Sequence, residues 1–177
     1  MKPYYISVDI EASGPAPSTH NLISIGAVAV ADLTQNFYVE MAPRNVIHLD
    51  DPNTQGALKV TGFTVEQLQS FMPPGQAMAR FRDWVNEVTP PGHRATFVSD
   101  NPVFDGLFIV DYFWRYTNSC PFGWSGLSLT SFYKGYAKSM RASFKHLRVT
   151  KHTHNALDDA TGNAEALQTL LRMLNQE

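Results

Sequence analysis

Four carboxylates and one histidine lie in or beside apolar stretches at three widely separated places in the chain. They are Asp9 and Glu11 near the N-terminus, Asp105 in the second half, and His154 and Asp159 near the C-terminus. An ionised carboxylate beside apolar residues is expensive unless another group compensates its charge. If the fold brings these five residues together, the oxygens of the four carboxylates suit two divalent cations, and the chemistry would be phosphodiester hydrolysis.

The first two acids belong to a predicted strand. From Tyr5 to Glu11 apolar and polar residues alternate, which is the period of a half-buried strand. Asp9 and Glu11 are two positions apart and therefore project from the same face, with backbones roughly 6.5–7 Å apart. Alone, this Asp-x-Glu pattern also describes an ordinary strand with a wet polar face.

The third acid lies in the first turn of a predicted helix. The residues three, four and seven positions after Asp105 are Phe108, Ile109 and Tyr112, so Asp105 is expected to point toward the core. A helix N-terminus favours a carboxylate. An acid that merely complements the helix dipole from a partly exposed position is the equal alternative.

Helical periodicity separates the two adjacent acids near the C-terminus. Asp158 falls nearly opposite the apolar seam of the last predicted helix and is expected in solvent, whereas Asp159 falls on the flank of the seam and leans inward. The seam is formed by Leu157, Ala160, Ala164, Leu167, Leu171 and Leu174. His154 lies just before this helix. A lone histidine is more often structural than catalytic, but its place five residues before an inward Asp favours a role in the site.

The remaining pattern predicts an α/β protein. Three leading strands with short connections indicate an antiparallel meander, and the later alternation of helices and strands indicates a mixed sheet covered by helices. Asn101 is expected to cap a helix that has Pro102 at its first position. The least legible part is 118–152. The predicted strands are 5–11, 22–30, 36–41 and 95–99, and the predicted helices are 64–71, 74–88, 102–116 and 156–175.

Length and composition narrow the class of protein. With 177 residues, 44% of them apolar, the chain is expected to form a single domain over residues 1–177. The longest near-apolar run, residues 22–31, is too short to cross a bilayer. Cys120 is the only cysteine, which excludes an intrachain disulfide and a cysteine zinc cluster. A cytoplasmic location without a membrane partner is expected.

The net charge of −2 conceals one basic segment. Residues 112–157 contain no acid, which indicates a surface that meets phosphate. A solvated loop that only aids solubility is the alternative. The segment has seven bases: Arg115, Lys134, Lys138, Arg141, Lys145, Arg148 and Lys151.

Together these motifs resemble a known superfamily. Asp9-Ile10-Glu11 followed by Ala-Ser-Gly, then residues 101–105 (Asn-Pro-Val-Phe-Asp), then residues 154–159 (His-Asn-Ala-Leu-Asp-Asp) are similar to the three motifs of the DEDDh 3′→5′ exonucleases, which include oligoribonuclease, ribonuclease T and proofreading exonucleases. The order matches over nearly the whole chain. There are two departures: Asp100 stands where a histidine or similar polar residue commonly precedes the asparagine, and Pro15 follows Gly14 where many members have an apolar residue.

The resemblance implies a ribonuclease-H-like fold, with a mixed five-stranded sheet made of a three-stranded antiparallel meander plus parallel strands and flanked by helices. It implies that Asp9, Glu11, Asp105 and Asp159 bind two divalent cations, Mg²⁺ or Mn²⁺, and that His154 is the general base. The expected substrate is single-stranded RNA or DNA, RNA slightly favoured, as short oligonucleotides or 3′ overhangs. A homodimer is compatible with the resemblance. Substrate contacts are expected from Ala12, Ser13, Asn101, Phe104, Lys145 and Lys151.

Two other functions use the same residues. A ribonuclease-H-like endonuclease would bind the same cations but would cleave an oligonucleotide whose 3′ end is blocked. A non-catalytic nucleic-acid-binding module on this fold would bind cations and hydrolyse nothing. The presence of all five functional residues argues against the second alternative.

Overall fold

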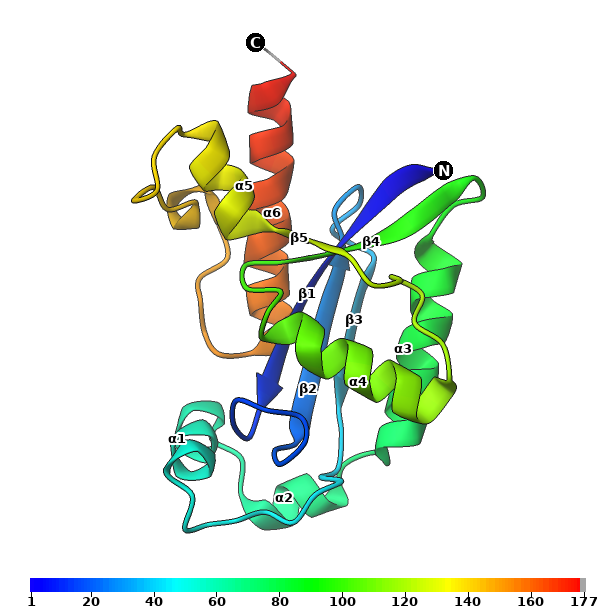
Figure 1. The fold of residues 1–177 in the computed structure, drawn as a ribbon, viewed down its shortest axis with the longest axis vertical. Helices are drawn as coiled ribbons and strands as arrows, with labels where there is room; N and C mark the ends of the chain where they lie inside the picture. Colours follow the sequence, from blue (N-terminus) through cyan, green and yellow to red (C-terminus); the bar gives the residue numbers. More distant parts are fainter. Residues whose placement is uncertain (176–177) are drawn as a thin grey trace.

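A five-stranded mixed sheet forms the centre of the protein. The structure is a computed structural model and describes residues 1–175. The strand order is β3-β2-β1-β4-β5, with β1 paired antiparallel to β2 and parallel to β4 (Figure 1). The first three strands form the predicted antiparallel meander, and β4 and β5 are parallel to β1. The strands are β1 (Lys2–Ala12), β2 (Leu22–Ala29), β3 (Asn36–Glu40), β4 (His93–Ser99) and β5 (Gly126–Ser128).

Helices cover both faces of the sheet (Figure 1). On one face, α3 (Pro74–Val88) and α4 (Asp105–Thr117) pack on apolar side chains of β1 such as Ile6, Val8 and Ile10. On the other face, α6 (Ala156–Leu174) and α5 (Leu129–Tyr136) pack on Val28, Val30 and Val98. Each face therefore has its own apolar cluster, and β1 is buried between them. The shorter helices are α1 (Pro52–Thr61), α2 (Val65–Ser70) and the 3₁₀ turn η1 (Lys145–Leu147).

Local sequence explains most helix ends. The predicted capping box of α2 is present, because the Thr64 hydroxyl accepts from the Gln67 N–H and the Gln67 side chain accepts from the Thr64 N–H. Asp51 caps α1, Pro52 is its first residue, and Gly62 ends it with a left-handed backbone. The α1 segment carries this complete signature, although its helix was not among the predicted elements.

One predicted helix start is wrong. Helix α4 begins at Asp105, not at Pro102, and Asn101 does not cap it with its side chain. The backbone carbonyl of Asn101 instead accepts from the N–H groups of Phe104 and Asp105, so residues 101–104 form a turn before the helix. This turn brings Asp105 to the first helical position, directly beside the end of β4.

The segment 118–152 contains more structure than its sequence indicates. It forms β5, α5 and η1, joined by turns. Its β5 edge strand has only three residues, too few to show a period of two. Among the described residues, no helix is both long enough and apolar enough to cross a membrane.

Candidate active site

The two acids of β1 lie at the carboxyl end of the central strand. Asp9 pairs with Gly26 and Glu11 with Ser24 of β2, so both side chains project from the same face as predicted. The intervening Ile10 is 3% exposed and belongs to the opposite core. The alternation along β1 therefore separates the acids from the apolar face.

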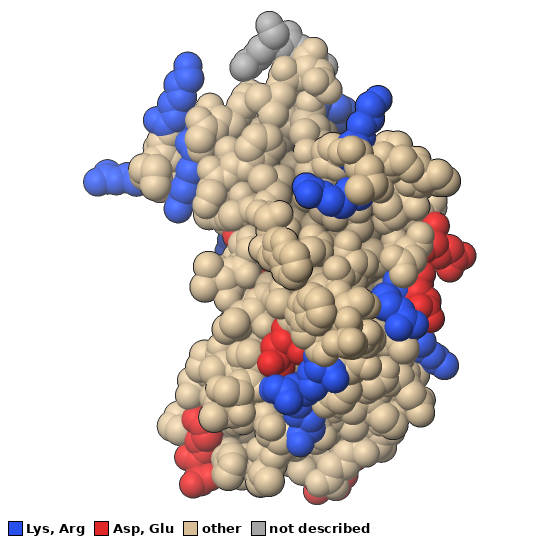
Figure 2. Space-filling view, turned by 45° about the vertical axis from the view of Figure 1, so that its right-hand side comes forward, with Lys and Arg blue, Asp and Glu red and all other residues tan. Residues whose placement is uncertain are grey.

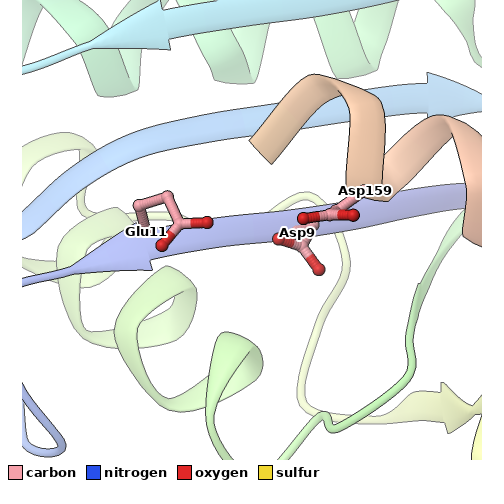
Figure 3. A group of neighbouring side chains, drawn as sticks. All are labelled: Asp9, Glu11 and Asp159. Atoms are coloured by element: carbon pink, nitrogen blue, oxygen red, sulfur yellow. The ribbon is translucent and has the colours of Figure 1, made fainter. Parts of the chain in front are cut away.

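Helix α6 places a third carboxylate against these two. Asp159 is 1% exposed, and one of its oxygens lies within 4.8 Å of oxygens of Asp9 and Glu11. Figure 3 shows Asp159 reaching from the first turns of α6 toward Asp9, with Glu11 directed at the pair from further along β1. The predicted distinction is confirmed: Asp159 points inward, whereas Asp158 is partly exposed and accepts from the Thr153 hydroxyl.

A glycine permits this close approach of α6. A Cβ atom at Gly26 would lie 2.1 Å from the Ala156 carbonyl oxygen, so any larger residue would push the start of α6 off the sheet. The Ser7 hydroxyl donates to the Ala160 carbonyl at 2.8 Å and fastens the next turn of the helix to β1. These two contacts fix the position of α6 on the sheet, and with it the position of Asp159 relative to Asp9.

Asp105 and Asp100 form a second group with Asp9. One oxygen of each of these three carboxylates lies within 4.8 Å of the others, and Asp105 is 3% exposed. Strands β1 and β4 are parallel neighbours, so their carboxyl ends meet at one edge of the sheet. Asp100 directly follows β4. Because no local pattern reports which strand lies beside β1, the sequence offered no signal for including Asp100 in the site.

Burial and crowding alter the acid strength of these groups. Burial, followed by the charges of Asp105 and Asp159, raises the pKa of Asp9 well above its usual value. Burial and the same two neighbours raise the pKa of Glu11 to about 8. Burial and the charge of Asp100 raise the pKa of Asp105 to about 7. Without a bound cation, Glu11 and Asp105 therefore retain protons to a large extent at neutral pH, and the donor set fits divalent cations.

Because of these pKa values, metal-free protein should lose stability as pH rises. The unfolded carboxyl groups ionise near pH 4, whereas folded Asp105 and Glu11 retain protons up to about pH 7 and 8. The folded state binds more protons in this window, so its free energy of unfolding falls between about pH 4 and pH 8. Thermal melts in EDTA at pH 5.5, 7 and 8.5 should show a decreasing Tm, and Mn²⁺ should reduce the decrease. A metal-free Tm that rises over this range would contradict the assignment.

His154 lies beside the carboxylate cluster with its side chain exposed. Its backbone N–H donates to Asp159 Oδ2 at 3.1 Å, which links it to the cluster. Its φ of 60° lies in the left-handed region, which is uncommon for residues other than glycine. The ring packs edge to face on His152, with 4.2 Å between the ring centroids. The imidazole is therefore exposed to solvent beside the carboxylate cluster.

The bases of the basic segment are exposed or partly exposed, except for Arg148, whose side chain is buried. In Figure 2, Lys and Arg side chains project from the upper left side, at the height of α5 in Figure 1, and no acidic side chain lies among them. Arg148 does not belong to this surface. Its guanidinium lies 2.7 Å from Asp159 Oδ1 and its side chain is 8% exposed. The interpretation of the segment as a phosphate-facing surface therefore does not extend to Arg148, which pairs with an acid eleven residues later, and Arg115 is paired with Asp111 on α4.

The expected substrate contacts lie in different environments. Ala12 and Ser13 are buried beside Glu11, and the Ser13 hydroxyl accepts from the Asn21 N–H. Asn101 is exposed, and Phe104 is partly buried against the core. Lys145 and Lys151 are exposed on the segment that leads to His154. Phe108 and Tyr112 are fully buried, which confirms that they pack in the core.

The fold and the carboxylate cluster define a class. A mixed sheet in this order, with acids at the ends of two parallel strands and at the start of the last helix, is the arrangement of a DEDDh exonuclease. Residues 4–171 match the family of the 3′-5′ exoribonuclease Rv2179c-like domain. The chain is also 31% identical to the 3′-5′ DNA exonuclease Cap18 of Escherichia coli, over 96% of this chain and 92% of the relative. The chain belongs to this exonuclease family, and it is a 3′→5′ exonuclease.

Solved structures agree on the fold. The nuclease domain of 3′hExo, a DEDDh family member bound to rAMP, superposes with a TM-score of 0.73 at 14% identity, over 96% of this chain and 92% of that one. Exonuclease I of E. coli in complex with single-stranded DNA gives 0.70 at 16% identity, over 99% of this chain and 42% of the larger protein. The ribonuclease-H-like mixed sheet predicted from the sequence is therefore confirmed. DEDDh exonucleases depend on divalent metal ions, in agreement with the acidic cluster.

Proposed function

We propose that this enzyme shortens single-stranded nucleic acid from the 3′ end and releases nucleoside 5′-monophosphates. The observation that carries the proposal is the grouping of the acids. Two sets of three carboxylates overlap at Asp9, one with Glu11 and Asp159 and the other with Asp100 and Asp105. Two overlapping sets of hard oxygen donors suit two cations better than one. Residues 1–177 would then act as a single exonuclease domain.

We assign a separate role in hydrolysis to each group of residues. Asp9, Glu11, Asp105 and Asp159 would hold two Mg²⁺ or Mn²⁺ ions, which would supply Lewis-acid stabilisation of the charge that develops on the phosphate. Neutral His154 accepts a proton from the attacking water. The water oxygen forms a bond to the phosphorus of the last phosphodiester, and the bond from that phosphorus to the 3′-oxygen breaks. The 3′-oxygen takes a proton from solvent water, and the shortened strand leaves with a 3′-hydroxyl.

RNA is the slightly favoured substrate, and DNA is the second. The family to which the chain belongs is described as exoribonuclease, which supports RNA. The relative at 31% identity is named a DNA exonuclease, which supports DNA. The exposed Lys145 and Lys151 would contact phosphates of either strand, and such contacts do not read the sugar.

Hydrolysis of labelled oligonucleotides tests this function. RNA and DNA oligomers of one sequence, labelled at the 5′ end, should each give a ladder that shortens from the 3′ end with Mg²⁺ or Mn²⁺, and EDTA should stop it. We expect the RNA ladder to advance at least as fast as the DNA ladder. An oligomer blocked at its 3′ end should remain intact. Internal cuts in the blocked oligomer would identify an endonuclease, and cation binding without hydrolysis would identify a binding module.

A further inference from the structure

A buried arginine lies beside the carboxylate cluster and is not explained by nucleic-acid binding. Arg148 Nη2 lies 2.7 Å from Asp159 Oδ1, and the two side chains are 8% and 1% exposed. Burying such an ion pair gives little net stability, because both charges lose water. We propose that Arg148 is a positioning residue, which fixes the Asp159 carboxylate toward Asp9 and Glu11. The proposal rests on the metal-dependent function proposed above.

Helix α6 leaves space for the Arg148 guanidinium. Gly162 is one turn after Asp159, and a Cβ atom there would lie 2.2 Å from Arg148 Nε and 2.6 Å from Nη2. The guanidinium therefore occupies the space that a side chain at position 162 would need. Its Nε also donates to the Thr150 carbonyl at 3.3 Å, which fixes the plane of the group.

A second contact holds the backbone that carries Arg148. The Glu165 carboxylate accepts from the N–H groups of Val149 and Thr150 at 2.8 and 2.7 Å, and from the Thr150 hydroxyl at 2.9 Å. These bonds attach residues 149–150 to α6 one turn beyond Gly162. Arg148 is thereby anchored on both sides of its guanidinium.

The same carboxylate connects the arginine to the proposed general base. Asp159 accepts from Arg148 on Oδ1 and from the His154 backbone N–H on Oδ2, and His152 Nδ1 also lies 2.7 Å from Oδ1. Rotation of the Asp159 carboxylate would therefore change its position as a proposed cation ligand and would also break its hydrogen bond with the His154 backbone. An arginine suits this role because its guanidinium is planar and charged at any working pH, whereas a lysine offers a single mobile point charge.

Two variants remove this arrangement in different ways. Arg148→Gln removes the guanidinium, whereas Gly162→Ala retains the charge and displaces it. Arg80→Gln, on the exposed side of α3, and Gly56→Ala, at a helical position in α1 with open space around it, are the matched controls. Calorimetric titration of metal-free protein with Mn²⁺, hydrolysis of a labelled oligomer at saturating Mn²⁺, and Tm in EDTA are measured for all four.

We expect both test variants to bind Mn²⁺ about 10–100-fold more weakly, the usual effect of losing a partner of a metal ligand. Hydrolysis should fall even at saturating Mn²⁺, and both controls should match the wild type. Alanine favours a helix interior, whereas displacing the buried guanidinium from Asp159 lowers stability, so the Tm of Gly162→Ala in EDTA is the check that the variant is folded at the temperature of the titration. Wild-type or tighter Mn²⁺ binding in Gly162→Ala would overturn the proposal. Absence of both Mn²⁺ binding and hydrolysis in the wild type would overturn the proposed function instead.

Discussion

Replacing His154 with alanine should reduce the turnover of a single-stranded oligomer by about 10²–10⁴-fold at pH 7.5, the usual contribution of a general base. Mn²⁺ binding should remain, because His154 contacts Asp159 through its backbone N–H and not through its ring. The loss should appear in kcat rather than in KM. Single-turnover hydrolysis measures the rate of the chemical step, and calorimetric titration of the same preparation measures Mn²⁺ affinity.

The left-handed backbone at His154 requires a second variant. Alanine tolerates a φ of 60° less well than histidine or asparagine does, so His154→Ala alone could act through strain. His154→Asn keeps a residue that suits this backbone and has no side-chain base. Equal losses in both variants would support proton transfer, whereas normal turnover in His154→Asn would exclude it.

A neighbouring histidine is the competitor for this role. His152 Nδ1 lies 2.7 Å from Asp159 Oδ1, and its side chain is 50% exposed. Because its ring already faces Asp159, we expect His152→Ala to act through that carboxylate and to have a smaller effect than His154→Ala. His93→Ala, at the start of β4 and thus at the opposite end of that strand from Asp100, should have none. A full loss in His152→Ala with normal turnover in His154→Ala would transfer the assignment to His152.

The sequence was sufficient for the parts of the site that follow local periodicity. Alternation along β1 correctly placed Asp9 and Glu11 on one face, and helical spacing correctly separated Asp159 from Asp158. Strand alternation and helical spacing each depend only on residues that are close in sequence, within one strand or within two helical turns. For the same reason the helix over residues 156–174 and the meander were predictable.

Contacts between distant segments were not predictable in the same way. Asp100 joins the cluster because β4 lies parallel to β1, and no local pattern reports which strands are neighbours. Arg148 counted as one more surface base, because a charge count does not show that Gly162 leaves room for its guanidinium. Residues 118–152 use turns and very short elements, which have no period to detect. The resemblance to DEDDh exonucleases supplied the convergence of the acids that local patterns could not supply.

Asp105→Asn should remove most Mn²⁺ binding and activity and should also make the metal-free protein more stable. Asparagine keeps the shape of the side chain but lacks the charge that a cation requires. Losing several kcal/mol of charge stabilisation corresponds to about 10²–10³-fold or more in rate. Burial raises the pKa of Asp105 to about 7, so its ionisation at pH 8 costs stability when no cation is present. The Tm in EDTA at pH 8 should therefore rise by several degrees.

Asp111, an acid on the same helix, gives a matched control for which the opposite change in metal-free Tm is expected. Asp111 forms ion pairs with Arg44, whose side chain is 9% exposed, and with Arg115. Asp111→Asn should lower the metal-free Tm, because it removes the carboxylate partner of the buried Arg44, and it should not change Mn²⁺ affinity. If Asp105→Asn also lowered the Tm, the buried carboxylate would be a structural group, and the cost of keeping it ionised would not belong to metal binding. A higher metal-free Tm in Asp105→Asn together with a lower one in Asp111→Asn would mean that the Asp105 carboxylate lowers the stability of the metal-free protein. This is expected of a carboxylate whose ionised form is stabilised by a bound cation.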